Sequence, residues 1–157
     1  MAKIKSLNAL KKVALRLKKQ GKRIVFTNGC FDILHYGHAK YLADAKCMGD
    51  CLIVAVNSDS SIRKIKGKKR PVVDEENRIK LLAALESVDY VVLFKETTPL
   101  AVIKAIKPDV LIKGSDWSKN SIVGSDVLKA YGGDVKTVKL VKGLSTTGLI
   151  KKIAKAY

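Results

Sequence analysis

The fold is decided by the stretch IVFTNGCFDILHYGH, residues 24–38. It opens with three apolar, strand-favouring residues at positions 24–26, which predict a short buried strand. Asn28 and Gly29 follow, and they predict a chain reversal because both residue types tolerate positive φ. Apolar residues then recur at helical spacing over positions 41–45. The stretch therefore predicts a strand, a tight turn and a helix in succession.

The two histidines of this stretch are the only ones in the 157-residue chain. His35 and His38 lie at the start of the predicted helix. A helix N-terminus presents unpaired N–H groups and the positive end of a dipole, and so attracts anions. Gly37 lacks a Cβ, so we expect a bulky anion to approach the backbone there. The pattern predicts a phosphate site with two imidazoles beside it.

A histidine pair is also half of a metal site, and most isolated histidines serve only packing. A zinc site would need further ligands, for which Cys30, Cys47 and Cys51 are the candidates. No Cys-x-x-Cys pair occurs in the chain. We therefore expect no metal ion held by the protein itself.

Composition indicates one domain, residues 1–157, because 47% hydrophobic residues can bury a core without disulfide bonds. Three irregularly spaced cysteines predict a reducing compartment. No apolar run approaches the ~20 residues of a membrane span, and the first residues lack a signal-peptide core. We expect a cytoplasmic protein without membrane contact.

The net charge of +17, from 31 Lys+Arg and 14 Asp+Glu, favours polyanionic partners. The densest positive run extends from Arg63 to Arg70 and is followed by Pro71. We predict that this run is a solvated loop with a flexible point at Gly67. A nucleic-acid patch is the alternative, but the run contains no aromatic residue to stack on bases.

The rest of the chain alternates between predicted strands and helices. Ser6 is placed to cap an amphipathic helix that Gly21 ends, so residues 1–21 are expected to dock an apolar stripe on the domain. Further strands are predicted at residues 52–56, 90–94, 110–112 and 135–141. The alternation predicts an α/β fold, a Rossmann-like three-layer sandwich with a five-stranded parallel sheet.

A second turn of glycine and hydroxyl residues, Lys142 to Thr147, precedes the last predicted helix. Ser145 has the chemistry of an ordinary N-cap. A second helix start of this kind is also what a triphosphate needs opposite the first. Trp117, the only tryptophan, follows a predicted strand end, and a half-exposed core position is its simplest interpretation.

The motif Gly29-Cys30-Phe31-Asp32-x-x-His35-x-Gly37-His38 resembles the G-x-F-D-x-x-H-x-G-H signature of the cytidylyltransferase-like nucleotidyltransferases. Residues 27–32 and Lys66 to Val72 are similar to the D-glycero-β-D-manno-heptose 1-phosphate adenylyltransferase family. Residues 114–117 and 143–147 resemble that superfamily's G-x-D-W/Y and G-x-S-T-T elements. The resemblance covers essentially the whole chain. It implies transfer of AMP from ATP to a heptose 1-phosphate, giving ADP-heptose for cell-surface polysaccharide.

The resemblance also implies roles for individual residues. His35 and His38 would be catalytic, at the phosphate chain. The nucleotide would be bound by Cys30, Phe31, Gly37, Asp116, Trp117, Gly143, Ser145, Thr146 and Thr147. The sugar phosphate would be bound by Asn28, Asp32, Lys66, Lys69, Arg70 and Arg78. Mg²⁺ would be carried with ATP, with Asp32 as an outer ligand, and relatives are usually homodimers.

Other functions remain open at this point. Arg78 also fits an ordinary helix pair with Glu75. A sister enzyme of the glycerol 3-phosphate cytidylyltransferase or FAD synthetase type is the nearest rival. Leu140 stands where relatives that use cytidine nucleotides carry arginine, which weakens the assignment to the cytidylyltransferase type. The chain is too short for an aminoacyl-tRNA synthetase, whose motif is similar to His-x-Gly-His. A basic nucleic-acid-binding module is the rival of another class, and we expect no specific nucleic-acid partner.

Overall fold

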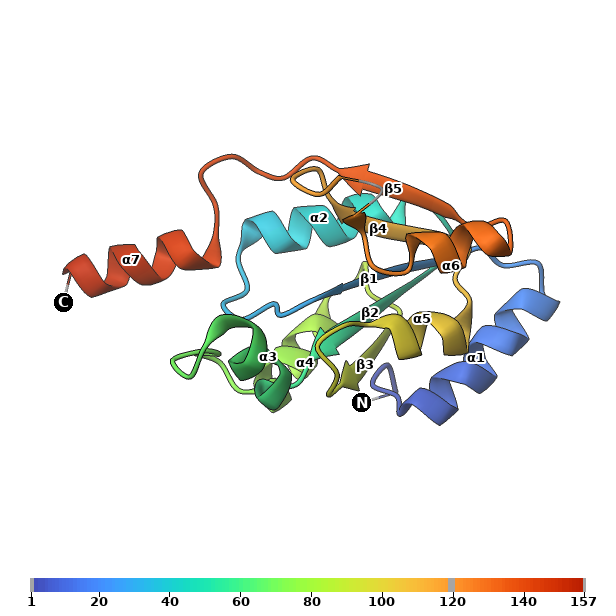
Figure 1. Ribbon diagram of the computed structural model, residues 1–157, viewed down its shortest axis with the longest axis horizontal. Helices are drawn as coiled ribbons and strands as arrows, with labels where there is room; N and C mark the ends of the chain where they lie inside the picture. Colours follow the sequence, from blue (N-terminus) through green and yellow to red (C-terminus); the bar gives the residue numbers. More distant parts are fainter. Residues whose placement is uncertain (1, 119–120, 157) are drawn as a thin grey trace.

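The computed structural model describes residues 2–118 and 121–156 and has five parallel strands in one sheet (Figure 1). The strands stand in the order β3-β2-β1-β4-β5, and every neighbouring pair is parallel. Their bounds are β1 Ile24–Gly29, β2 Cys51–Asn57, β3 Tyr90–Phe94, β4 Val110–Gly114 and β5 Asp134–Val138. The predicted Rossmann-like α/β fold is confirmed.

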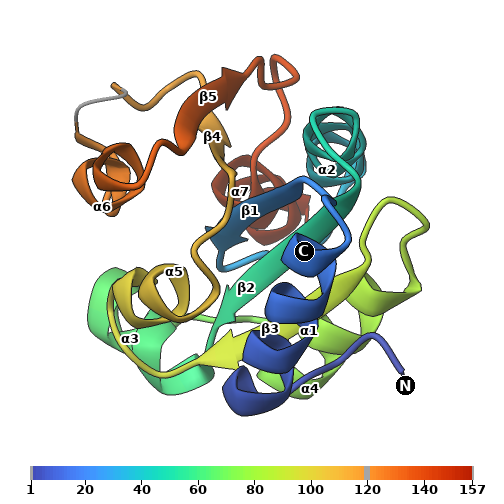
Figure 2. The same cartoon turned by 90° about the vertical axis from the view of Figure 1, so that its right-hand side faces the viewer.

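Seven α-helices accompany the sheet in the described residues: α1 Leu7–Lys19, α2 Tyr36–Lys46, α3 Asp59–Lys66, α4 Glu75–Ala84, α5 Leu100–Ile106, α6 Ser125–Ala130 and α7 Thr146–Ala156. Helices α1, α5 and α6 lie against one face of the sheet, and α2 and α4 lie against the other (Figure 2). Their buried side chains belong to two separate core clusters, one on each face. Helix α7 extends away from this body and buries none of its residues (Figure 1).

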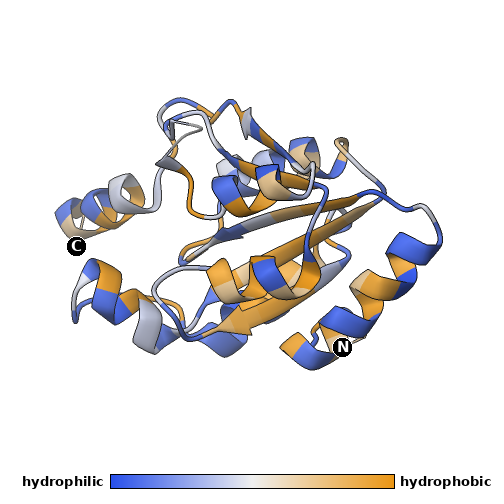
Figure 3. Ribbon diagram, turned by 45° about the vertical axis from the view of Figure 1, so that its right-hand side comes forward, coloured by the Kyte–Doolittle hydropathy of each residue, from blue (hydrophilic) through white to orange (hydrophobic). Residues whose placement is uncertain are grey.

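The strands are apolar because both faces of the sheet are covered. Ile24 and Phe26 of β1 belong to one core cluster, while Val25 between them belongs to the other. All seven residues of β2 are buried, as expected where helices lie on both sides of a parallel sheet. The colouring by hydropathy shows the strands as the apolar centre of the molecule (Figure 3).

Helix α1 docks on this core as its amphipathic pattern predicts. The Ser6 hydroxyl accepts a hydrogen bond from the Ala9 N–H at 3.3 Å and so caps the helix. Leu10 and Ala14 are buried in the first core cluster. The chain leaves the helix through Gly21, whose φ of +67° suits glycine. Within the described residues, no helix is long and apolar enough to cross a membrane.

The order of the strands creates a crevice between β1 and β4. From β1 the chain moves outward to β2 and then β3, and α5 returns it to β4 on the opposite side of β1. Connections therefore leave neighbouring strands in opposite directions at the carboxyl ends of β1 and β4. Such a switch point is where open α/β sheets bind ligands.

The chain reversal predicted at Asn28 and Gly29 is wrong. Strand β1 runs through Gly29, and the residue with positive φ is Phe31, at +47°. Gly29 serves close packing instead, because a Cβ there would lie 3.0 Å from the Phe31 ring. The left-handed region is unusual for a bulky residue and is maintained here by the surrounding structure.

Two further predictions of local structure need correction. The positive run from Arg63 to Arg70 is not a continuous loop, since α3 covers residues 59–66 with Ser58 as its N-cap and Gly67 as its end. Ile62 is fully buried and anchors this helix. Strand β5 ends at Val138 and not at residue 141, so residues 139–145 form a connection to α7.

Candidate active site

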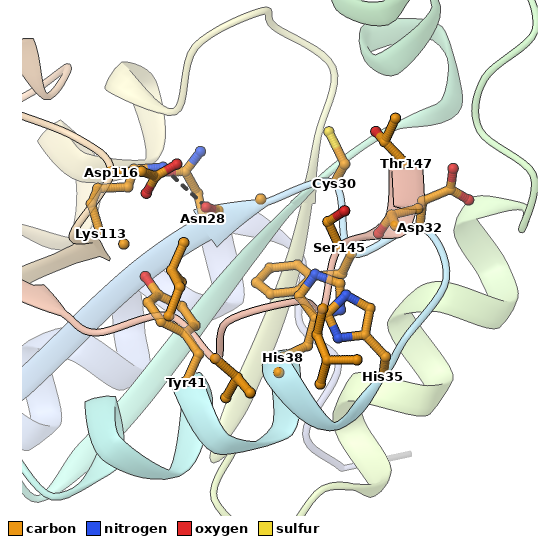
Figure 4. A pocket seen from close by; sticks show the side chains of 18 of the residues that line it. Asn28, Cys30, Asp32, His35, His38, Tyr41, Lys113, Asp116, Ser145 and Thr147 are labelled. Carbon is orange, nitrogen blue, oxygen red and sulfur yellow. Dashed lines mark hydrogen bonds between the residues drawn. The ribbon is translucent and has the colours of Figure 1, made fainter. Parts of the chain in front are cut away.

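A cavity of about 360 Å³ opens at the crevice between β1 and β4. Its walls come from four parts of the chain: the end of β1 with the connection to α2 and the first turns of α2, the end of α3 with the loop after it, residues 113–117 at the end of β4 and just after it, and residues 140–147 before and within α7. Figure 4 shows labelled side chains from the histidine motif, from the end of β4 with the residues after it, and from around the start of α7 facing a common space. The histidine motif and the second glycine–hydroxyl turn therefore line the same cavity.

His35 and His38 stack on each other at the start of α2. Their ring centroids are 4.0 Å apart with an interplanar angle of 22°. His35 is the N-cap residue, and the His38 N–H donates to the His35 carbonyl at 2.9 Å, so one helical turn sets the spacing. Both nitrogens of His35 and Nδ1 of His38 are buried without a hydrogen-bond partner in the described chain. Buried polar atoms of this kind are suited to hold a ligand.

Burial keeps both imidazoles neutral at pH 7. It lowers the pKa of His35, and it lowers the pKa of His38 to about 4, with further contributions from the neighbouring His35 and the positive charge of Lys66. Phe31 adds to the apolar surroundings, since its ring meets the His38 ring edge-on at a centroid distance of 5.4 Å. The pair can therefore donate hydrogen bonds to an anion without carrying charge.

Gly37 makes room for a histidine. A Cβ at Gly37 would lie 3.0 Å from both Cε1 and Nδ1 of His35. We expected the missing Cβ to let an anion approach the backbone, and Gly37 does line the cavity. The structure adds a second reason for glycine, which is the space that the His35 ring occupies. Any side chain there would displace the stacked imidazole.

Asp32 fastens the loop after α3 to the histidine motif. Its buried carboxylate accepts hydrogen bonds from the N–H groups of Val72 and Val73, both at 2.8 Å, and from Nε of Arg70 at 2.6 Å. Burial alone would raise the pKa of Asp32, but the N–H groups of Val73 and Val72 and the Arg70 guanidinium outweigh it and lower the pKa. Asp32 therefore positions Arg70 beside the cavity.

The basic end of the cavity contains Lys66 and Arg70. Nη2 of Arg70 is buried and has no partner among the described residues, which leaves a donor for a ligand. Lys69 does not line the cavity and is exposed. The structure therefore places only two of the three basic residues predicted for this loop at the cavity.

Arg78 lies behind the cavity wall, and its predicted contact with a sugar phosphate is not what the geometry gives. The side chain is 1% exposed. Its guanidinium donates to the carbonyls of Val73 at 2.9 Å and Cys30 at 2.6 Å, and it pairs with the Asp59 carboxylate at 2.7 Å. The alternative pair with Glu75 is also wrong, because the Glu75 carboxylate accepts from the Asp59 N–H. Arg78 positions the loops that bear the site.

The opposite end of the cavity contains Asn28, Lys113 and Asp116 (Figure 4), and Trp117 also lines the cavity. Nζ of Lys113 donates to the Asn28 carbonyl at 3.0 Å and lies 5.6 Å from the centroid of the Trp117 ring. Asn28, predicted to bind the sugar phosphate, is thus on the side of Asp116, away from the basic loop. Lys113 was missed from the sequence, although its place at the end of an apolar strand was a usable signal.

The start of α7 closes the remaining side of the cavity. Ser145 lines it and acts as an N-cap, accepting from the Gly148 N–H at 3.0 Å. Gly143 has a φ of +78°, a conformation that favours glycine at this turn, though it does not itself line the cavity. Thr146 and Thr147, at the start of α7, also line the cavity, and their contact with a nucleotide stays a prediction. The apolar wall of Leu140, Val141 and Leu144 was not predicted.

The Cytidylyltransferase-like family matches residues 26–151, which include the histidine pair and the turn before α7. The chain belongs to this family.

Curated relatives extend the likeness over nearly the full chain. The bifunctional protein HldE of Geobacter metallireducens is 53% identical over 156 residues, which are 99% of this chain and 32% of the relative. HldE of Geobacter sulfurreducens is 52% identical over the same shares. The chain thus spans about a third of the length of these relatives.

Solved structures give the same fold. A lipopolysaccharide core biosynthesis protein from Thermoplasma volcanium is 34% identical, with a TM-score of 0.63, covering 78% of this chain and 98% of that one. A pantoate-beta-alanine ligase from Francisella tularensis has a TM-score of 0.64, covering 97% of this chain and 78% of that one. Its identity is only 15%, so it shows the fold alone.

The donor set of this cytidylyltransferase-like cavity does not fit a metal ion caged by protein. In the described residues, no group of three or more His, Cys, Asp or Glu side chains is placed to hold a metal. Asp32, the expected outer ligand, already accepts hydrogen bonds from two backbone N–H groups and Arg70. Cys47 and Cys51, the other candidates for a zinc site, do not line the cavity.

Proposed function

We propose that the chain is an adenylyltransferase that joins the AMP of ATP to a heptose 1-phosphate and releases pyrophosphate. One observation carries this proposal: two neutral imidazoles that have no hydrogen-bond partner among the described residues lie in one cavity with two helix starts and a separate basic end. The match to HldE proteins at about half identity supports the same activity, and the likeness to a lipopolysaccharide core biosynthesis protein supports a sugar of cell-surface polysaccharide as the acceptor.

The cavity divides into parts that fit two anionic substrates. The starts of α2 and α7 offer backbone N–H groups to a triphosphate, with Thr146 and Thr147 beside them. Asp116 and Trp117 at the far end border the nucleoside in this proposal. Lys66 and Arg70 receive the phosphate of the sugar, because a guanidinium with an unused Nη2 is suited to phosphate oxygens.

The chemistry needs no covalent intermediate. An oxygen of the sugar phosphate is already an anion, and it attacks the α-phosphorus of ATP while the bond to pyrophosphate breaks. The protein aligns two anions that repel each other and stabilises the charge that develops on the phosphoryl oxygens. His35 and His38 donate hydrogen bonds to those oxygens and to the leaving group.

Further parts of the proposal concern conditions and assembly. Mg²⁺ arrives with ATP, since it prefers phosphate oxygens and water to a full protein cage. The reaction belongs in the cytoplasm, and the active form is a homodimer. Sedimentation of the purified chain at several concentrations tests the last point, and a monomer throughout contradicts it.

A pyrophosphate-release assay tests the activity. Wild-type protein is incubated with ATP, CTP, GTP or UTP, each combined with α- and β-heptose 1-phosphates, glycerol 3-phosphate and FMN. We expect release only with ATP and one heptose 1-phosphate. Release with CTP and glycerol 3-phosphate, or with ATP and FMN, would assign the chain to a sister activity instead.

Matched variants of the basic loop test how the cavity is divided. Arg70→Gln is expected to raise the KM for the sugar phosphate severalfold with little change in that for ATP, because it removes a charge-assisted contact. Lys69→Gln removes the same charge from the neighbouring exposed residue and is expected to change neither constant. If Arg70→Gln instead raises the KM for ATP, the basic end of the cavity holds the triphosphate.

A further inference from the structure

Lys113 lies on the floor of the crevice where the sheet divides. It is the penultimate residue of β4, Asn28 is the penultimate residue of β1, and these strands are neighbours. The hydrogen bond from Nζ of Lys113 to the Asn28 carbonyl, at 3.0 Å, spans the gap between them. A ligand seated at the switch point therefore meets this side chain.

The described residues offset the charge of the Lys113 ammonium group only in part, through Cys30 and Asp116, which favour its charged form. In the part of the chain that the structure describes, Lys113 forms no ion pair. One of its three N–H donors is used on the Asn28 carbonyl, and the face of Trp117 gives a weak cation–π contact at 5.6 Å. A partly buried cation without a counter-ion costs free energy, and such groups concentrate at functional sites.

We propose that Lys113 contacts the bound nucleotide and does so only as an ammonium ion, so that nucleotide affinity depends on its protonation. The inference rests on the proposed nucleotidyl transfer and adds a residue that neither the motifs nor the family comparison assigns. The α-phosphate is bonded to the nucleoside that Asp116 and Trp117 border in the proposed function, and it supplies the missing counter-charge. Nucleotide binding therefore raises the proton affinity of Lys113. At a pH above the pKa that Lys113 has in the free protein, the protein must take up a proton when it binds the nucleotide.

The surroundings of Lys113 define the pH range in which this effect is seen. Burial lowers its pKa to about 8, while Cys30 and Asp116 partly oppose that shift. Tyr41 and His38, from α2, do not titrate between about pH 7 and 9, because burial raises the pKa of the tyrosine and lowers that of the histidine to about 4. Cys30 is another neighbour of Lys113 in the cavity, so its replacement serves as a control.

The experiment measures the dissociation constant of MgATP at pH 7 and pH 9 for three proteins. Wild type is expected to bind about tenfold more weakly at pH 9, because the protonated fraction of a group with a pKa of about 8 falls from roughly nine-tenths to one-tenth. Lys113→Arg is expected to bind equally at both pH values, since a guanidinium stays charged. Lys113→Met is expected to bind weakly at both.

Trp117 provides a second readout that does not depend on activity. It is the only tryptophan, and Nζ of Lys113 lies over its ring, so its emission should change as Lys113 titrates near pH 8. Cys30→Ser is expected to keep this transition, and Lys113→Arg is expected to abolish it. A transition lost in Cys30→Ser and kept in Lys113→Arg would show that Lys113 is not the group responsible and would overturn the inference.

Two other outcomes also overturn it: Lys113→Met binding MgATP as wild type does, or Lys113→Arg losing affinity between pH 7 and 9 as steeply as wild type. Failure of the proposed function looks different. In that case wild type keeps its pH-dependent affinity for MgATP, while no sugar phosphate in the panel yields pyrophosphate.

Discussion

Replacing Arg78 by methionine is the sharpest test of how this site is built. Arg78 is fully enclosed and makes three polar contacts, each with a different segment: Cys30 in the histidine motif, Val73 in the loop after α3, and Asp59 at the start of α3. Methionine fills much of the same space without donating a hydrogen bond. The substitution therefore removes the contacts while limiting the loss of packing.

The expected cost is large relative to the stability of the domain. Breaking a buried ion pair by removing one partner costs about 3–5 kcal/mol, because the remaining charge and carbonyls lose their partners. A domain has about 5–15 kcal/mol of stability in total. With a urea m-value of about 2 kcal/mol/M, the midpoint of unfolding should fall by about 2 M.

Urea unfolding followed by circular dichroism measures this change, with Arg63→Met as the matched control. Arg63 is exposed on α3, so its replacement should alter stability by no more than ~0.5 kcal/mol. Combining Arg78→Met with Asp59→Ala should cost less than the sum of the two, since the carboxylate is no longer left unpaired. A loss below ~1 kcal/mol for Arg78→Met would refute the reasoning.

Three more predictions follow from the cavity. His35→Ala and His38→Ala should each lower kcat and kcat/KM together by ~10²–10³ with little change in the KM for ATP, and near-normal turnover of both variants would remove their catalytic role. The pKa of His38 is about 4 in the folded chain and 6.5 without burial, so its contribution to stability is present above pH 6.5 and is lost as pH falls toward 4. Urea unfolding at pH 7, 5.5 and 4.5 should therefore show that the free energy of unfolding declines less in His38→Gln than in wild type. Asp32→Asn should raise the KM for the sugar phosphate by loosening Arg70, and an unchanged KM would show that Asp32 does not position it.

The fold and the histidine motif could be predicted from the sequence because their signals are local. Apolar runs marked the buried strands, Ser6 and Gly21 marked the ends of α1, and the spacing of His35 and His38 placed both rings at one helix start. Each of these features depends on neighbours within a turn or a strand. Only the structure shows which of these segments meet around the cavity.

The failures share a cause, which is that the deciding partner is distant in the chain. Arg78 fits a helix pair with Glu75 by spacing, yet it pairs with Asp59, 19 residues away. Helix α3 was hidden by its charge, although Ile62 gives it one buried anchor. Phe31, and not the more permissive Gly29, takes the positive φ because packing at the histidine motif decides the backbone there.

In the proposed reaction, the charged groups of the cavity and its neutral hydrogen-bond donors affect the rate in different ways. The fixed cations Lys66 and Arg70 attract phosphate in substrate and product alike, so they favour binding more than turnover. The imidazoles of His35 and His38 are neutral at pH 7, because burial lowers the pKa of both. A neutral donor gains most when negative charge on the oxygen it faces increases, as happens while the bond to pyrophosphate breaks. Two more cations at that point would bind pyrophosphate tightly and slow its release. In the proposed reaction, the apolar setting of the pair would therefore direct stabilisation to the transition state.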